Sequence, residues 1–289
     1  MREFNYYEPK AISEACGLLR AEGAKVIAGG TDLIVQIKRG VLKPASVINI
    51  KSVEELNGIT ASDEGLTIGA LTKISKIAAS ADILGHNRAI CVGADNIGTP
   101  QVRSLATIGG NICNSSPCAD TVPGLLVADA VAIIADGTGE RRMPLADFFR
   151  GPGKNALDKE KGELLKAIFL PKLPENTTQG FYKAGPRKAA DIAVINMAIS
   201  LSFKNGICTR ARIAMGSVAP VPKRAYDAEN AIESRGTIRD FDEIAELIAR
   251  AASPIDDVRG SAKYRLHMLR VAAAELLEEL CNRGEGKND

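Results

Sequence analysis

The stretch "ATIGGNICNSSPCAD", residues 106–120, is too polar for a hydrophobic core and is rich in groups that bind ligands. It holds a diglycine, two cysteines and an aspartate. Two different sites could be built from it: a metal site on Cys113 and Cys118, or a cradle for an anion on the backbone of Gly109 and Gly110. The rest of the sequence distinguishes between these two sites.

Metal ligands are scarce in this chain. Its six cysteines, at positions 16, 91, 113, 118, 208 and 281, form no C-x-x-C pair, and His86 and His267 are the only histidines. A plant-type iron–sulfur motif would place a third cysteine three positions after Cys118, where this chain has Thr121. A structural zinc site needs about four such ligands. The sequence therefore favours the anion cradle, free thiols and no metal site.

A second diglycine supports the cradle. In "VIAGGTDL", residues 26–33, an apolar β-like run leads to Gly-Gly and then to a small polar residue, as it does in residues 106–111. Glycines at a strand end let backbone N–H groups approach an anion, because no Cβ intervenes and positive φ is allowed. A helix starting near Thr31 would add its positive end. Two such loops could hold a pyrophosphate from both sides. Neither loop has the Rossmann or P-loop spacing, and the alternative is that each diglycine is only a tight turn between a strand and a helix.

The composition indicates a globular protein. The 289 residues suffice for about two domains, with 45% hydrophobic and 25% charged residues and a net charge of +2. Basic residues form no cluster, which argues against nucleic acid as a partner. The apolar stretch 124–136 is interrupted by Asp129 and is too short for a membrane span. Because the N-terminus also lacks the apolar run of a signal peptide, we expect a cytoplasmic protein.

The pattern of elements predicts an α+β fold. Residues 1–56 read as βαβαβ, with strands near 4–9, 24–30 and 46–50 and helices near 12–23 and 31–40, which implies parallel strands. Ser52 and Glu55 have the spacing of a capping box. Residues 57–172 read as hairpins near 58–72 and 130–145, helices between them, and a strand at 164–171. We predict a linker at 172–180, an antiparallel pair across Lys204-Asn205-Gly206, and helices beyond about 224.

Three motifs in order carry a resemblance to a known family. They are "AGGTDL" (28–33), "TIGGNICNSSPCAD" (107–120) and "FYKAGPRKAADIAVIN" (181–196). Together they resemble the FAD-binding medium subunit of molybdenum hydroxylases. This family includes the flavin subunits of aerobic carbon monoxide dehydrogenase and nicotinate dehydrogenase and the middle domain of xanthine dehydrogenase. The resemblance extends over about residues 1–280.

The resemblance implies a fold and a function. The fold is an FAD-binding domain of the vanillyl-alcohol-oxidase/PCMH type at residues 1–172, with two α/β subdomains at about 1–56 and 57–172. A C-terminal domain of the carbon monoxide dehydrogenase flavoprotein type, with an antiparallel sheet and helices, follows at residues 178–282. The function is an oxidoreductase subunit with one FAD, which passes electrons between [2Fe–2S] clusters of a small subunit and an external acceptor. The molybdopterin would belong to a large subunit, so no catalytic residue is expected in this chain.

The resemblance also implies the residues that bind FAD. The first pyrophosphate loop would be Val26, Ile27, Ala28, Gly29, Gly30, Thr31, Asp32 and Leu33. The second would be Thr107, Ile108, Gly109, Gly110 and Asn111. Asp120 would accept hydrogen bonds from the ribityl or a neighbouring polar part, Ile97 and Leu165 would be apolar contacts, and Lys183 would lie near the flavin.

Each of these assignments has a structural alternative. Asp32 would repel a phosphate and is better explained as a charge at a helix N-terminus. Lys183 could be a surface lysine, and Ile97 and Leu165 could be core residues. Two other functions also fit the same motifs: a stand-alone FAD-dependent oxidoreductase of the same superfamily, or a nucleotide-binding assembly protein without redox activity.

Overall fold

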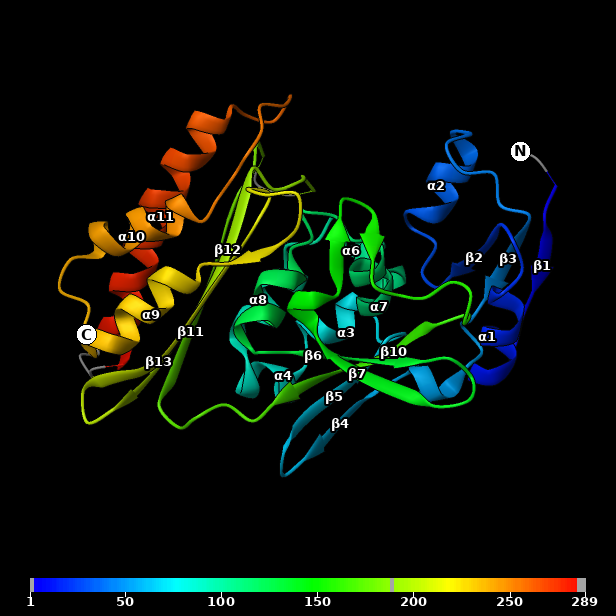
Figure 1. The fold of residues 1–289 in the computed structure, drawn as a ribbon, viewed down its shortest axis with the longest axis horizontal. Coiled ribbons are helices and arrows are strands. Elements are labelled where there is room, and N and C mark those ends of the chain that lie inside the picture. Colours follow the sequence, from blue (N-terminus) through cyan, green and yellow to red (C-terminus); the bar gives the residue numbers. More distant parts are fainter. Residues whose placement is uncertain (1–2, 188–189, 285–289) are drawn as a thin grey trace.

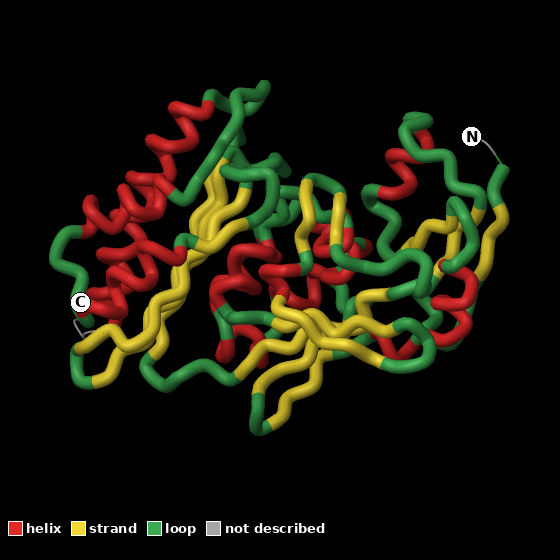
Figure 2. Tube along the Cα trace, viewed as in Figure 1, coloured by secondary structure: helices red, strands yellow, loops and turns green. Residues whose placement is uncertain are grey.

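Three larger sheets follow one another from the N-terminus to the C-terminus of the chain (Figure 1), and the strands β8 and β9, given below, form a separate two-stranded sheet. The computed structural model describes residues 3–187 and 190–284, so residues 188 and 189 of the third motif lie outside the described residues. Helices and strands alternate in the first part and separate into layers in the last part (Figure 2). None of the helices in these two ranges is long and apolar enough to cross a membrane.

The N-terminal part is a small parallel sheet, as the alternating pattern predicted. Its elements are β1 (Asn5–Tyr7), α1 (Ile12–Leu19), β2 (Ala24–Ile27), α2 (Leu33–Lys38) and β3 (Ser46–Asn49), and the strand order is β1-β3-β2. Both strand pairs are parallel, which confirms the βαβαβ prediction. The short 3-10 helix η1 (Glu54–Leu56) follows, but Val53 stands at its N-terminus and no side chain caps it. The capping-box prediction was wrong: the fully buried Val53 and Leu56 anchor this turn instead.

A five-stranded antiparallel sheet forms the middle of the molecule. Its order is β4 (Ile59–Ser62), β5 (Gly65–Gly69), β10 (Leu164–Pro171), β6 (Val131–Ala135) and β7 (Glu140–Pro144). The predicted hairpins β4–β5 and β6–β7 flank β10, which arrives last in the sequence and closes the sheet. The small elements η2 (Leu145–Asp147), β8 (Phe149–Gly151) and β9 (Lys154–Asn155) follow β7.

Six helices lie between the strands of this middle sheet in the sequence. They are α3 (Ile74–Ala78), α4 (Ala81–His86), α5 (Arg88–Asp95), α6 (Pro100–Leu105), α7 (Ile108–Cys113) and α8 (Thr121–Val127). Helices α5 and α8 pack on each other and also contact the C-terminal sheet. All seven residues of α8 are buried, because this helix lies between two sheets (Figure 1).

The C-terminal part is a four-stranded antiparallel sheet with three helices. Its order is β11 (Thr177–Ala184), β12 (Ile195–Lys204), β13 (Ile207–Gly216) and β14 (Lys223–Arg224). Helices α9 (Tyr226–Arg235), α10 (Phe241–Arg250) and α11 (Ala262–Gly284) cover one face, and α5 and α8 approach the other. Asn205 and Gly206 both have positive φ in the β12–β13 turn, as a tight Asn-Gly hairpin requires. The α+β class is confirmed, whereas the predicted linker is shorter than expected, because β11 already begins at Thr177.

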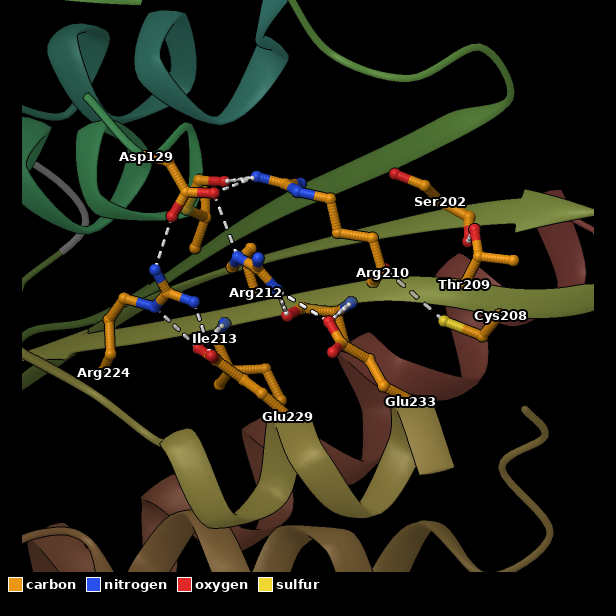
Figure 3. A network of polar contacts seen from close by, with 12 residues as sticks. Asp129, Ser202, Cys208, Thr209, Arg210, Arg212, Ile213, Arg224, Glu229 and Glu233 are labelled. Carbon is orange, nitrogen blue, oxygen red and sulfur yellow. Dashed lines mark hydrogen bonds and ion pairs between the residues drawn. The ribbon is translucent and has the colours of Figure 1, made fainter. Parts of the chain in front are cut away.

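A network of charges ties α8 to the C-terminal sheet (Figure 3). Asp129, just beyond the end of α8, accepts hydrogen bonds from Arg210 Nη2 at 2.8 Å and Arg212 Nε at 3.0 Å, and pairs with Arg224. Arg212 also pairs with Glu233, and Arg224 with the buried Glu229. Burial works to raise the pKa of Asp129, but the hydrogen bond from Arg210 and the three guanidinium charges lower it below its usual value.

Asp129→Asn should lower the free energy of unfolding by about 2 kcal/mol near neutral pH, because a charged acceptor of several hydrogen bonds is lost. Since the folded-state pKa of Asp129 is lowered, its stabilising effect is present above the unfolded pKa and is lost as pH falls through the folded pKa. The deficit of the variant should therefore shrink in acid. Urea unfolding over a pH series measures it. Asp63→Asn in the exposed β4–β5 turn is the control, and a deficit that does not change with pH would contradict this account.

Candidate functional site

The first diglycine forms an open cradle of backbone donors between β2 and α2. Gly30 has φ +72°, a conformation that favours glycine. Among the described residues, no hydrogen-bond acceptor is found for the backbone N–H groups of Gly29, Gly30, Thr31 and Asp32. Asp32 is exposed, and its carboxylate accepts a hydrogen bond from Gln36 one turn later. This segment can therefore offer several N–H groups to an anion.

The second diglycine is built differently from the prediction. Residues 108–113 form helix α7 rather than a strand followed by a loop. The Thr107 hydroxyl caps this helix by accepting from Gly110 N at 3.2 Å. Ile108 N donates to Thr72 O at 3.0 Å and Gly109 N to Ala70 O at 2.8 Å. The expectation of two equivalent loops was therefore wrong, because the N–H groups of α7 already have acceptors inside the protein.

A sequence signal for this helix was present. Thr107 is a favourable helix N-cap, and Ile108 and Ile112, four positions apart, are both fully buried. Two side-chain donors remain for a ligand at this segment. The Thr107 hydroxyl accepts from Gly110 N and can still donate its own proton. The Asn111 side-chain oxygen accepts from Thr121 at 2.6 Å, whereas the Asn111 amide nitrogen is not engaged by any described residue.

The two diglycine segments meet in space. An added Cβ on Gly29 would collide with the carbonyl oxygen of Leu105 and lie 2.8 Å from the Cα of Ala106, immediately before Thr107. Gly109 is equally close to Ala70, with only 2.6 Å from its ideal Cβ to the Cβ of Ala70. Both glycines are therefore required by close packing, and the free N–H groups at Gly29–Asp32 lie beside the N-terminus of α7.

Asp120 and Lys183 form a buried ion pair. Lys183 Nζ lies 2.7 Å from Asp120 Oδ2 and 3.5 Å from Asp191 Oδ1, and all three side chains are at least 93% buried. Asn196 Nδ2 donates to Asp120 Oδ1 at 2.8 Å, and Lys183 Nζ donates to Asn96 O at 2.9 Å. Asp120 and Lys183, which the sequence analysis named separately, thus lie in one cluster, and burial of the Lys183 side chain excludes the alternative of a surface lysine.

Burial raises the pKa of Asp120, and the charge of Lys183 with its hydrogen bonds opposes that effect. Asp191 and Asn196 were missed by the sequence analysis, although both lie in the third motif. The signal that could have found them is their residue type: a carboxylate and an amide next to or within an otherwise apolar strand require buried partners.

The remaining predicted residues are placed as follows. Val26 and Ala28 pack against the core of the N-terminal sheet, and Leu33 begins α2. Ile97 is half-buried directly after Asn96, so it lies next to the Lys183 cluster. Leu165 is 1% exposed in β10 and belongs to the main hydrophobic core. The structural alternative of a core residue therefore fits Leu165 better than it fits Ile97.

The two cysteines of the opening stretch have separate surroundings. Burial raises the pKa of Cys113 to about 12, which keeps this thiol protonated. Cys118 Sγ accepts a hydrogen bond from Arg259 Nη1 at 3.2 Å. Within residues 3–187 and 190–284, no group of three or more His, Cys, Asp or Glu side chains is arranged to hold a metal ion.

Lys183→Met should lower the free energy of unfolding by about 3 kcal/mol near neutral pH, because two buried carboxylates lose their counter-charge. The deficit should shrink in acid: a carboxyl with a raised folded pKa binds its proton more readily when folded, so stability rises as pH falls through that value. Urea unfolding over a pH series tests this. The double variant Lys183→Met/Asp120→Asn should be less pH-dependent, and an equally steep dependence in the double variant would refute the role given to Asp120.

Comparison with known proteins relates this geometry to a family. Residues 2–173 match the family described as FAD binding domain in molybdopterin dehydrogenase. Residues 180–280 match the CO dehydrogenase flavoprotein C-terminal domain. The xanthine dehydrogenase FAD-binding subunit of Escherichia coli O157:H7 is 31% identical over 98% of each chain. The carbon monoxide dehydrogenase medium chain of Afipia carboxidovorans is 32% identical over 95% of this chain and 96% of that protein.

Solved structures agree with these matches. A chain of the Cu,Mo-CO dehydrogenase superposes with a TM-score of 0.90 at 30% identity, over 97% of this chain and 98% of that chain. A chain of quinoline 2-oxidoreductase from Pseudomonas putida 86 also gives a TM-score of 0.90 at 24% identity and shares the fold. The chain therefore belongs to the family of FAD-binding subunits of molybdopterin-dependent dehydrogenases.

Proposed function

We propose that this chain binds one FAD and passes electrons between [2Fe–2S] clusters of a small partner subunit and an external acceptor. The molybdopterin of the complex belongs to a large partner subunit, and the complex is cytoplasmic. The observation that carries this proposal is the row of free N–H groups at Gly29–Asp32, held against the start of α7 in a chain of this family. The names of the relatives, which are FAD-binding subunits and medium chains of larger dehydrogenases, support the partners.

The residues present fit a dinucleotide. The N–H groups of Gly29–Asp32 would hold the pyrophosphate, and Gly30 supplies the positive φ of the turn that carries them. The Thr107 hydroxyl and the Asn111 amide would supply two further donors. Since the α7 N–H groups are engaged, the second segment contributes these two side chains and not its backbone.

Asp120 and Lys183 act as a pair. Each carboxylate oxygen of Asp120 accepts one hydrogen bond from the protein, from Asn196 or from Lys183, and retains a lone pair for a hydroxyl of the cofactor. Lys183 neutralises Asp120 and fixes its direction. Flavin, when bound, supplies the ability to accept and release two electrons; the chain supplies binding, orientation and local charge. We propose no covalent catalytic step for any side chain of this chain.

The division into domains follows the sheets. We place the FAD-binding domain at residues 1–172 and the C-terminal domain at 178–282, with the connection at 172–176 between β10 and β11. The proposed cofactor site uses both, because Lys183 and Asn196 come from β11 and β12 whereas the other polar contacts precede residue 121.

The cofactor should be FAD and not FMN, because the free N–H groups and the two side chains of the facing segment suit a pyrophosphate between two nucleotide halves. Mild denaturation of the purified chain followed by chromatography against standards identifies the released flavin. FMN as the main product would refute this assignment.

Gly29→Ala should lower the FAD content per chain at least tenfold, because its Cβ would push the cradle away from Leu105 and Ala106. Absorption near 450 nm per mole of chain measures the content, and circular dichroism verifies the fold. Gly17→Ala in α1 is the matched control, since an added Cβ there meets no atom within 4 Å. A folded Gly29→Ala protein with full flavin content would show that the cradle is elsewhere.

A further inference from the structure

Arg265, near the start of α11, is a buried arginine that makes none of the proposed cofactor contacts. Its side chain is 2% exposed. Nη1 donates to Val194 O at 2.6 Å and to Ser217 O at 2.8 Å, and Nη2 lies 2.6 Å from Asp257 Oδ1. A buried charge of this kind is weak evidence for stability, because apolar residues of similar volume often stabilise a protein equally well. The role of Arg265 is therefore better judged from the segments that its guanidinium holds in place.

The first branch holds the ends of two strands. Val194 immediately precedes β12 and Ser217 immediately follows β13, where Asn196 pairs with Gly216. Both strand ends contact the stretch 117–120: Ser217 N donates to Pro117 O at 2.7 Å, and Asn196 Nδ2 donates to Asp120 Oδ1. Arg265 thus fixes the two backbone positions from which this stretch is contacted.

The second branch reaches the same stretch through a turn. Asp257, the carboxylate partner of Arg265, also pairs with Arg259 at 2.7 Å and accepts from the Arg259 backbone N–H at 2.8 Å. Arg259 Nη1 then donates to Cys118 Sγ. Asp257 and Arg259 compensate each other's charge within this turn. The other partner of Asp257, the buried guanidinium of Arg265, therefore fixes the orientation of the turn.

Local bonds order residues 117–120 only weakly. Three hydrogen bonds join this stretch to its sequence neighbours among the described residues: Cys118 N to Ser116 Oγ, Ala119 N to Ser116 O and Val122 N to Ala119 O, each at 3.2 Å. The contacts from Ser217, Arg259 and Asn196 all come from the C-terminal sheet and its loops. Ordering one residue costs about 1–2 kcal/mol of conformational entropy, so a polar stretch of this kind needs such external contacts.

We propose that Arg265 is a positioning residue that orders Pro117–Asp120 and thereby aims the Asp120 carboxylate at the cofactor. It acts from the C-terminal helix through Val194, Ser217 and the turn at Asp257–Arg259, and it touches no ligand itself. The part of this inference that concerns the cofactor rests on the proposed function, whereas the ordering of residues 117–120 does not.

Three variants of the full chain test the inference. Arg265→Met removes both branches. Arg259→Met, at a side chain that is 30% exposed, removes the contact with Cys118 together with the ion pair to Asp257. It leaves the pair of Arg265 with Asp257 and both bonds of Arg265 to the strand ends in place. Arg270→Met is the matched control, because it breaks an ion pair of the same helix, with Glu246 at 2.6 Å, away from the stretch. Amide hydrogen exchange of residues 113–121 is measured on cofactor-free protein, and FAD binding by titration.

Arg265→Met should raise exchange in residues 113–121 about tenfold and weaken FAD binding about tenfold, the effect of misplacing one charged hydrogen-bond acceptor. Arg259→Met should shift both quantities in the same direction by less, and Arg270→Met should change neither. In Arg265→Met, amide exchange in α10 should remain as in the wild type.

Unchanged exchange at 113–121 in Arg265→Met, or an increase spread evenly over α9–α11, would overturn the inference. If Arg265→Met does not fold, wild-type exchange at 113–121 in Arg259→Met would overturn it instead. A wild-type chain that binds no FAD would refute the proposed function, while the exchange measurement would still decide whether Arg265 orders the stretch.

Discussion

Helix α8 is held against the C-terminal sheet by a buried or half-buried carboxylate at each end, and the arrangement of the two larger sheets depends on this constraint. Asp120 stands at its N-terminus and pairs with Lys183 of β11 and Asn196 of β12. Asp129 follows its C-terminus and pairs with Arg210 and Arg212 of β13 and Arg224 of β14. A carboxylate moved out of water needs such partners, so a slip of the helix along the sheet would leave charges uncompensated at both ends.

The same constraint explains why the proposed cofactor residues come from both halves of the chain. A diglycine cradle requires only local sequence, because Gly30 supplies positive φ and Gly29 permits a close approach of two backbones. The polar cluster around Asp120 requires a second sheet, because its cation and its amide come from strands that begin after residue 176. The proposed site is therefore complete only when the C-terminal sheet is docked on α8.

The sequence predicted those features that depend on local patterns. The βαβαβ start, the β4–β5 and β6–β7 hairpins, and the Asn205-Gly206 turn all followed from periodicity and turn residues. The second diglycine misled the prediction, because its similarity to the first concealed a Thr107 cap and the buried pair Ile108 and Ile112, which make a helix. The two diglycine segments are similar in sequence but differ in their free backbone donors. Thr72 O and Ala70 O, from a neighbouring turn, accept from the first two N–H groups of α7.

Non-local contacts limited the rest. Asp191, Asn196 and the bond of Arg259 to Cys118 depend on how β12 and the turn before α11 are placed against α8, which no local pattern encodes. The motifs identify Asp120 and Lys183 as two separate site residues. The direct ion pair between them means that they act as one group. Lys183 has two carboxylates and two backbone carbonyls, those of Asn96 and Asp191, as partners. Its charge is therefore compensated within the protein, where it orients Asp120. At the proposed site a cofactor would meet the charge of the whole cluster. That charge depends on the protonation of Asp120, whose pKa is raised by burial.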